Sequence, residues 1–335
     1  MSVQTIRAAA MCLTLLAQAS QVHSAELALP KDGWASWQVE AVEGAPALCC
    51  WNSSDEREVA RTSCQLDRDP SYFGTRDHET TDAARVYARV VGGKVERLRV
   101  LSATCQVETA TPIQELGAVA TDDSARWLIT LSKSSAGADE NNDLGENVLA
   151  ALAMHRGDPA HNALVAVARG DSRAETRKRA VFWLALLRGK AGADVATSIM
   201  FNDKDAAVRK HAAFAITQSK SPRVAAELIR LGNTDKDGDV RAQAWFWLAH
   251  TGAAQAENAI AAALRKDDDD HVREQAIFAL SQLPEERATR ALIATAEDQS
   301  LSREHRKRAV FWLSQSQADA AQAYLEKVLA RNFTN

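Results

Sequence analysis

The second half of the chain contains one short sequence pattern five times, and this repeat constrains the fold more than any other feature. Each copy runs from an arginine through a phenylalanine to a leucine or isoleucine. The copies are segments 177–184, 209–216, 241–248, 273–280 and 306–313, and their arginines are 32, 32, 32 and 33 residues apart. A constant period of this length is typical of a solenoid, in which each unit buries its apolar face against its neighbours.

Turn residues divide this array into helix pairs. Asp158-Pro159 and Ser221-Pro222 each place a capping side chain before a proline that suits the first helical turn. Four glycines, Gly170, Gly189, Gly232 and Gly252, fall where helices must stop. We therefore predict helix pairs at 158–188, 191–220, 221–252, 253–283 and 285–316, and a last helix at 318–331. The second helix of each pair carries the repeated motif.

The turns before these second helices share a pattern of aspartate, Val-Arg and spaced small residues. Val208-Arg209, Val240-Arg241 and Val272-Arg273 each follow an aspartate and precede an alanine by three positions. This pattern resembles short HEAT-like repeats of the phycobilisome-lyase type over residues 158–332. The resemblance implies a mainly α fold, a right-handed α-α superhelix. Members of this class include protein-binding scaffolds, bilin lyases and a di-iron hydroxylase, so the resemblance leaves the function open.

The first 24 residues read as an export signal. Arg7 supplies positive charge, the apolar core runs from Ala8 to Ala19, and we expect cleavage after Ser24. That core is too short to span a bilayer, and no later stretch reaches the ~18 apolar residues that a transmembrane helix needs. We therefore expect an extracytoplasmic protein, periplasmic or secreted, without stable membrane insertion.

Between residues 33 and 110 the pattern is that of a small β-rich domain. Bulky residues alternate from Trp34 to Val39, as in a half-buried strand. Segments 84–91 and 94–101 flank Gly92-Gly93 and predict a β-hairpin with arginines on its solvent side. The polar stretch 52–81 is interpreted as a loop. Two apolar helices, 124–133 and 144–155, then predict a capping unit at 122–157.

Four cysteines remain after removal of the signal: Cys49, Cys50, Cys64 and Cys105. An even number in an exported protein favours disulfides. A bond between the two adjacent cysteines would be strained, so we predict that one of them pairs with Cys64 and the other with Cys105. Which pairs with which stays open. A zinc site that adds His78 is the alternative, disfavoured because the spacing lacks paired C-x-x-C knuckles.

The candidate contact residues form a phenylalanine row, one residue in each repeat, accompanied by Trp245. The row is Phe182, Phe214, Phe246, Phe278 and Phe311. On a helix this position points away from the apolar stripe. One interpretation is an aromatic ladder on the inner surface that binds a peptide or an extended protein segment. The other, which we favour on sequence grounds, is that the rings fill gaps between successive second helices.

Two charged patterns have structural interpretations. The arginines that open the motifs follow aspartates at Asp171, Asp205, Asp239 and Asp270, which predicts a charge ladder between repeats, not a phosphate-binding track. Segment 233–239 resembles the start of an EF-hand loop, but its twelfth position is Ala244, so we interpret it as a turn between helices.

Catalysis finds little support in the sequence. The histidines do not recur at one register, and no hydrolase, metalloprotease or P-loop motif occurs. The net charge of −4 gives no general attraction to nucleic acid. We expect a non-enzymatic scaffold for a protein or peptide partner, without cofactor or metal. The alternative is an envelope enzyme or small-ligand binder with a site where the two parts meet, near Tyr87, His78 and Trp127.

Overall fold

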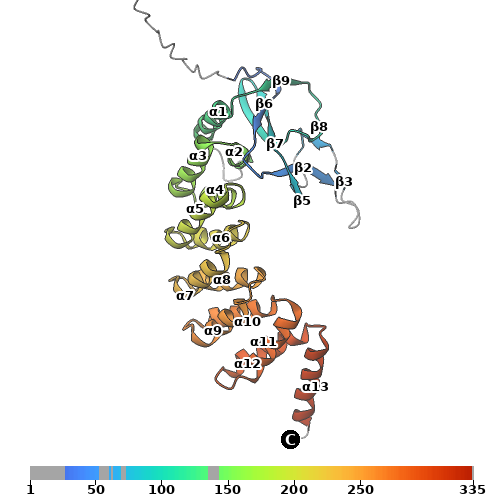
Figure 1. Cartoon of the computed structure of the whole chain (residues 1–335), viewed down its shortest axis with the longest axis vertical. Coiled ribbons are helices and arrows are strands. Elements are labelled where there is room, and N and C mark those ends of the chain that lie inside the picture. Colours follow the sequence, from blue (N-terminus) through green and yellow to red (C-terminus); the bar gives the residue numbers. More distant parts are fainter. Residues whose placement is uncertain (1–26, 53–59, 62, 69–72, 135–142, 334–335) are drawn as a thin grey trace, which may run out of the picture.

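The computed structural model describes residues 27–52, 60–61, 63–68, 73–134 and 143–333, so the predicted export signal lies outside the described residues. Figure 1 shows a β-rich module at one end and a stack of helix pairs leading away from it. The expected fold class is confirmed: a repeat solenoid of helices follows a small module of strands. Within the described part, no helix is both long enough and apolar enough to cross a bilayer.

The module contains a four-stranded sheet with the order β7-β6-β1-β9. Its strands are β1 (Gly33–Glu40), β6 (Ala83–Val91), β7 (Lys94–Ser102) and β9 (Ile113–Ala118). The predicted hairpin is confirmed as β6 and β7, with Gly92 and Gly93 at φ of 57° and 77°. Both turn positions lie in the left-handed region, where a residue without a Cβ avoids strain.

Two expectations for the module are wrong, and one of its strands was not predicted. The stretch interpreted as a loop contains β5 (Phe73–Thr80), which pairs antiparallel with β2 (Pro46–Asn52). Strand β9, parallel to β1, was not predicted at all. Arg99, expected on the solvent side of the hairpin, is only 5% exposed because β7 lies between β2 and helix α2. In each case a long-range partner, which local polarity does not reveal, decides the environment of the residue.

Smaller strand pairs complete the module: β3 (Ala60–Arg61) pairs with β2, and β4 (Cys64–Gln65) pairs with β8 (Val107–Glu108). The cysteines join as predicted, and the open connectivity is resolved as Cys49–Cys105 and Cys50–Cys64, with Cα–Cα distances of 5.5 and 5.2 Å. Successive residues of a strand face opposite ways, so the adjacent cysteines of β2 reach different partners.

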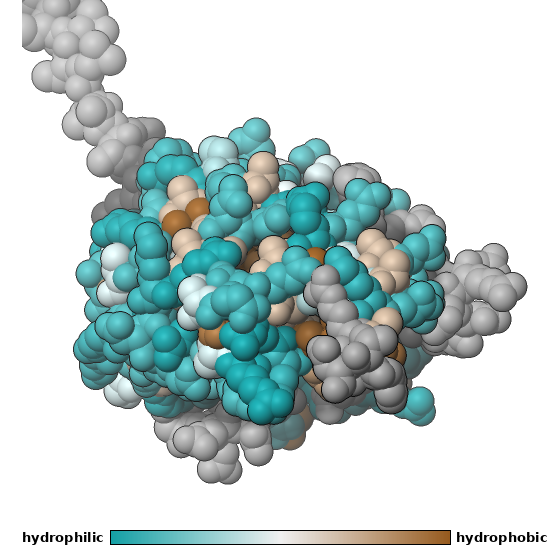
Figure 2. All heavy atoms as spheres, turned by 90° about the horizontal axis from the view of Figure 1, so that it is seen from below, coloured by the Kyte–Doolittle hydropathy of each residue, from teal (hydrophilic) through white to brown (hydrophobic). Residues whose placement is uncertain are grey.

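The array consists of five helix pairs and a final helix. The pairs are α3–α4 (Asp158–Gly170, Ala174–Leu187), α5–α6 (Gly189–Asn202, Ala206–Thr217), α7–α8 (Val224–Thr234, Gly238–His250), α9–α10 (Ala256–Lys266, Asp270–Ser281) and α11–α12 (Glu285–Glu297, Arg303–Ser314), followed by α13 (Asp319–Phe333). In repeat two, an apolar stripe of Val208, Ala212, Ala215 and Ile216 forms the core of the second helix, with each residue at most 1% exposed. Seen from the α13 end, hydrophilic residues cover most of the surface (Figure 2).

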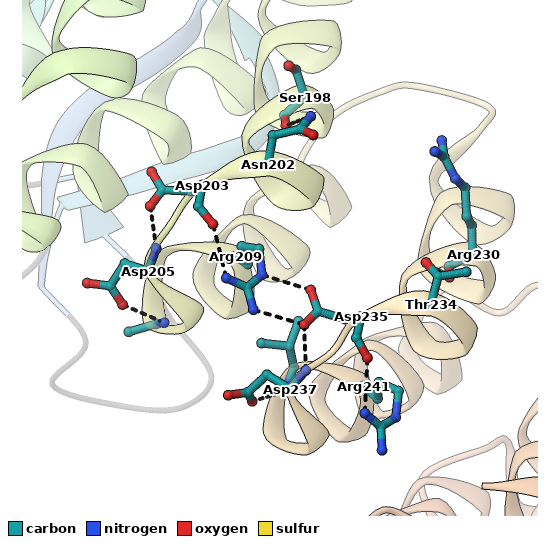
Figure 3. Close-up of polar contacts among 12 residues, drawn as sticks. Ser198, Asn202, Asp203, Asp205, Arg209, Arg230, Thr234, Asp235, Asp237 and Arg241 are labelled. Atoms are coloured by element: carbon teal, nitrogen blue, oxygen red, sulfur yellow. Dashed lines mark hydrogen bonds and ion pairs between the residues drawn. The ribbon is translucent and has the colours of Figure 1, made fainter.

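A ladder of ion pairs joins successive repeats (Figure 3). In each rung the Nε and Nη2 atoms of an arginine donate to both carboxylate oxygens of an aspartate 26 residues later, at 2.8 to 3.0 Å. The rungs are Arg177–Asp203, Arg209–Asp235 and Arg241–Asp267. The Nη1 atom of each arginine donates to the carbonyl oxygen of the preceding turn aspartate, as Arg209 does to Asp203 at 3.0 Å. Each guanidinium thus holds two neighbouring turns together.

The predicted ladder exists, but its carboxylates are not the ones expected. Asp205 accepts from the N–H of Ala207 and caps α6, and Asp270 binds Arg273 within one helical turn. An aspartate at a helix N-terminus accepts hydrogen bonds from the backbone N–H groups of that helix. The aspartate that binds the arginine is instead the one that directly follows the first helix of the next repeat, as Asp235 follows α7. After Asp267 this series reaches Gln299, so Arg273 meets no carboxylate at this register and pairs with Asp270.

Burial makes these pairs sensitive to the loss of one partner. The side chains of Arg209 and Asp235 are 3% and 5% exposed. Burial raises the pKa of the Asp235 carboxyl, but hydrogen bonds from Arg209 and from the N–H of Asp237 outweigh it, so the net pKa lies below its usual value. Removal of the arginine would therefore leave a buried charge without compensation.

A buried chain of hydrogen bonds joins the module to the two helices that precede the array. It runs from β1 to helices α1 (Thr121–Ser134) and α2 (Asp143–Met154). The indole N–H of Trp37 donates to Ser124 Oγ (2.7 Å), the Ser124 hydroxyl donates to His155 Nε2 (2.8 Å), and His155 Nδ1–H donates to the carbonyl of Ala151 (2.6 Å). A carbonyl only accepts, which fixes the neutral tautomer of His155. Burial lowers the pKa of His155 to about 4.

The two disulfides offer a matched comparison. Because Cys49–Cys105 closes a sequence separation of 56 residues and Cys50–Cys64 one of 14, loop-closure entropy predicts losses in unfolding free energy of about 4 and about 3 kcal/mol respectively. Urea denaturation of C49A/C105A and C50A/C64A, followed by tryptophan fluorescence, checks the order. Equal losses, or a larger loss for C50A/C64A, would contradict this account.

The ladder predicts that Arg209→Met lowers the unfolding free energy by about 3 kcal/mol, because it strands the buried Asp235 carboxylate. Arg273→Met, at the same register of a repeat whose arginine pairs with the exposed Asp270, should cost under about 1 kcal/mol. Chemical denaturation of the two variants measures the difference. Similar losses would show that the bidentate ion pair contributes no more to the unfolding free energy than packing of the aliphatic part of the arginine side chain.

The pKa of His155 predicts a pH dependence of stability. Below about pH 6.5 the unfolded chain binds a proton at this residue, whereas the folded chain stays neutral down to about pH 4. The contribution is therefore complete above pH 6.5 and is lost as pH falls toward 4, by about 3 kcal/mol in total. The difference in unfolding free energy between wild type and His155→Gln should therefore be smaller at pH 4.5 than at pH 7. A constant difference would refute the assignment.

Candidate functional site

Aromatic side chains form a continuous row across the second helices of the array. The rings of Phe182 and Phe214 are stacked with centroids 5.9 Å apart, and those of Phe246 and Phe278 are stacked at 5.7 Å. Trp247 bridges the two stacks, because its ring lies 4.8 Å from Phe214 and 4.9 Å from Phe246. The four phenylalanines share one register of their helices and Trp247 follows Phe246 by one residue, so stacking of the repeats brings the rings together.

The row continues to the last repeat through Trp312, whose ring lies 5.1 Å from both Phe278 and Phe311. We call this set of seven rings the aromatic row: Phe182, Phe214, Trp247, Phe246, Phe278, Trp312 and Phe311. Ala215 and Ala279, which hold the tryptophan register in the alternate repeats, are fully buried. A tryptophan of the following repeat packs against the phenylalanine beside each alanine, so large and small residues alternate along this register.

The aromatic row is partly packed and partly exposed. Phe182, Trp247 and Trp312 pack against the main core, whereas Phe214, Phe246 and Phe278 stand outside it and are half-buried. Phe311 is 50% exposed. The rings therefore fill space between second helices and also present faces to solvent, so both sequence interpretations describe part of the same arrangement.

Trp245, predicted as a contact residue, is buried at 1% exposure, and that prediction is wrong. Its ring lies against Gly232 of α7, where an added Cβ would approach the ring to 2.5 Å. Trp245 precedes Phe246 by one residue, so it lies about 100° around the helix and points into its own repeat. The glycine at position 232, assigned from sequence only to the end of a helix, leaves the room for this ring.

A groove of about 450 Å³ lies over the aromatic row between α8 and α10. Phe246, Phe278 and Ala242 supply its apolar wall, and Gln243 and Gln275 supply two side-chain amides. Its charged residues already pair with one another. Asp239 lies 3.7 Å from the Nζ of Lys210 and 3.3 Å from the Nε2 of His271. The groove thus offers apolar contact and neutral hydrogen bonding.

The junction of the two parts holds a second cavity, of about 700 Å³. Glu43 and Glu79 of the module face it from one side, and Lys190, Lys220 and Arg223 of the array from the other. A third, more apolar cavity of about 680 Å³ lies among α1 to α4. Sequence reasoning identified neither set of lining residues, because each cavity is formed by segments far apart in the chain.

Of the residues proposed for a junction site, Tyr87 and Trp127 lie in separate apolar clusters. Tyr87 is 2% exposed in the small core around the disulfides, and burial raises the pKa of its hydroxyl to about 12. Trp127 packs edge-on against Trp37 at 5.2 Å. His78 belongs to β5, but its side chain lies outside the described residues.

The EF-hand-like segment is a turn with a helix cap, as interpreted. Both carboxylate oxygens of Asp235 bind Arg209, and Asp237 accepts from the N–H of Val240 at 3.1 Å and caps α8. In the described part of the chain, no three histidine, cysteine, aspartate or glutamate side chains gather as ligands for an ion.

A family model agrees with the helical-repeat architecture. The family model for HEAT repeats matches residues 161–245 and 233–310. Human deoxyhypusine hydroxylase in complex with glycerol is a similar solved structure, with 19% identity and a TM-score of 0.32, over 63% of this chain and 79% of that one. The Escherichia coli protein YibA shows 20% identity and a TM-score of 0.38, over 62% and 80%. A search of curated protein sequences gives no match.

Neither structural likeness bears on the activity of this chain. The match to the family model falls on the segment in which the bidentate arginine ladder and the aromatic row repeat. Residues 161–310 of this chain are HEAT repeats, and a cysteine-containing β-rich module precedes them.

Proposed function

We propose that this protein is a non-enzymatic scaffold that binds another protein or a peptide along the aromatic row. The observation that carries the proposal is the groove between α8 and α10, where half-buried Phe246 and Phe278 form an apolar wall bordered by the side-chain amides of Gln243 and Gln275. Buried aromatic anchors with a polar surround are what protein-binding surfaces commonly provide.

The rigidity of the row supports the same function. Phe246 and Phe278 stack on each other, and Trp247 packs against Phe246, so the rings are held in place before a partner arrives. Ordering side chains on binding costs about 0.5–1.5 kcal/mol for each flexible group. A surface that is already ordered avoids most of that cost.

We also propose that the protein acts outside the cytoplasm. Arg7 and the apolar core that follows form a signal-like start, and the Cys49–Cys105 and Cys50–Cys64 pairs are typical of oxidising compartments. A binding surface in that setting would meet envelope or secreted polypeptides.

A second candidate is a small-ligand binder with its site in the junction cavity. The charges of its lining favour it: Glu43 lies on one wall, and Lys190 and Arg223, which share Asp194 as their ion-pair partner, lie on the other. A zwitterionic molecule would meet complementary groups on both walls. Native mass spectrometry of the purified chain separates the two candidates, since a retained small molecule lost in Lys190→Glu/Arg223→Glu supports the second one.

For the scaffold, we expect Phe246→Ser/Phe278→Ser to reduce capture of polypeptides from envelope extract at least tenfold, because it removes the apolar wall of the groove. Leu329→Ser is the matched control, since Leu329 is an exposed apolar residue of α13, at 56% exposure, away from the row. Quantitative mass spectrometry after cross-linking measures capture, and circular dichroism melting confirms folding. Equal capture by wild type and the double variant would reject the aromatic row as the contact surface.

A further inference from the structure

We propose that the bound partner is an extended polypeptide segment, held by hydrogen bonds from glutamine side chains on both borders of the aromatic row to its main chain. This inference rests on the proposed function and names the class of partner. Its basis is a repeated placement of amides that the packing of the array does not require.

The first border lies one helical turn before the phenylalanines. The residues at this register are Arg179, His211, Gln243, Gln275 and Arg308. The terminal arginines are engaged, since Arg179 lies 3.1 Å from Glu146 and Arg308 lies 3.1 Å from Glu274. The two central glutamines differ. Among the described residues, no hydrogen bond joins either amide to a protein partner, and both line the groove. Their donors and acceptors are available to a ligand.

The second border lies one turn after the phenylalanines, at Gln218, Gln282 and Gln315. Each amide nitrogen donates to the hydroxyl of the preceding residue, at 3.0, 3.0 and 3.2 Å. Each hydroxyl in turn donates to the carbonyl of the row phenylalanine, at 2.7, 2.6 and 2.6 Å. The repeat of Phe246 has His250 at this register, and His250 Nδ1–H donates directly to the Phe246 carbonyl at 2.9 Å.

This relay fixes the orientation of the second-border amides. The nitrogen is turned toward the helix, which leaves the amide oxygen as an acceptor on the outer side. The first border carries both a donor and an acceptor at each amide. A chain laid along the row therefore meets hydrogen-bonding groups on both sides and aromatic rings beneath it.

The chemistry selects an extended segment over a helix. A side-chain amide has the same donor and acceptor as a peptide unit, so it pairs with main-chain N–H and C=O groups that are free. An extended segment exposes those groups, whereas a helix uses them internally. Since Lys210, Asp239 and His271 already pair with one another, the groove requires no particular charge of its occupant.

The test uses a phage-displayed library of random linear dodecapeptides, selected against the wild-type chain, with the best binder synthesised for fluorescence anisotropy. We expect Gln243→Leu/Gln275→Leu to weaken binding about tenfold, the loss of roughly one net hydrogen bond. Gln299→Leu is the control, a glutamine at the α11–α12 turn whose amide donates to the Glu297 carbonyl. Its affinity should equal that of wild type. Thermal melting of each variant checks folding.

A second arm tests main-chain recognition directly. Replacement of single peptide bonds of the probe by esters removes one N–H donor at a time, and we expect at least one such probe to lose about fivefold in affinity for wild type but not for the double glutamine variant. Unchanged affinity across all ester probes, or a helical bound probe by nuclear magnetic resonance, would overturn the inference.

The outcomes separate this inference from the proposed function. Loss of binding in Phe246→Ser/Phe278→Ser, together with wild-type affinity in the glutamine variant, would support the aromatic row as the contact surface and reject main-chain recognition by the glutamines. Wild-type affinity in both variants would reject the row as well. A library that yields no binder to wild type would count against the proposed function and so against this inference.

Discussion

Burial of small residues between neighbouring second helices is the constraint on which the structure depends. Ala212, Ala244 and Ala276 occupy one register and are fully buried. A single helix pair cannot bury the face that carries these alanines until the next pair stacks on it, so the array folds by propagation between neighbours. Small side chains let the helices approach closely, which brings every other register of adjacent repeats into contact as well. The aromatic row and its amide borders are consequences of that approach.

The arginine ladder converts this stacking into a fixed register. An apolar interface tolerates small slides, because hydrophobic contact is not directional. A bidentate guanidinium–carboxylate pair is directional and buried, so Arg209 and Asp235 accept one arrangement only. Where the spacing changes from 32 to 33 residues, the aspartate series reaches Gln299 and the bidentate rung is lost. The repeats beyond Arg241 therefore rely on packing more than those before it.

How far the sequence predicts this structure depends on the range of the interaction. The period, the helix pairs, the hairpin at Gly92-Gly93 and the pairing of each adjacent cysteine with a distant one all follow from local pattern and chain geometry. Strand β5 is polar and contains a glycine, so only its pairing with β2 makes it a strand. The prediction of the ladder aspartates was wrong for a similar reason, since an aspartate that shortly precedes an arginine in sequence caps its own helix, as Asp205 does.

The candidate site shows the same division. The phenylalanine row is evident from the period, but the side to which each aromatic residue turns is not. Trp245 and Phe246 are adjacent and similar in character, yet one is buried against Gly232 and the other lines the groove. Helical geometry predicts that they diverge, and only the position of α7 decides which one is covered. The placement of the Gln243 and Gln275 amides in the groove had no signal in a single sequence beyond their common register.

The two ends of the array are closed differently, and this bears on how a partner would approach. At the first end, α1 packs on α3 and α2 on both α4 and β7, so the module covers the face that a preceding repeat would have covered. The chain from Trp37 through Ser124 to His155 satisfies the polar groups that this closure buries. At the other end α13 packs on α11 and α12 and leaves Leu329 exposed. Phe311, the last ring of the row, is also its most exposed. A long segment that enters along the row would therefore meet covered, ordered structure toward the module and open surface toward α13.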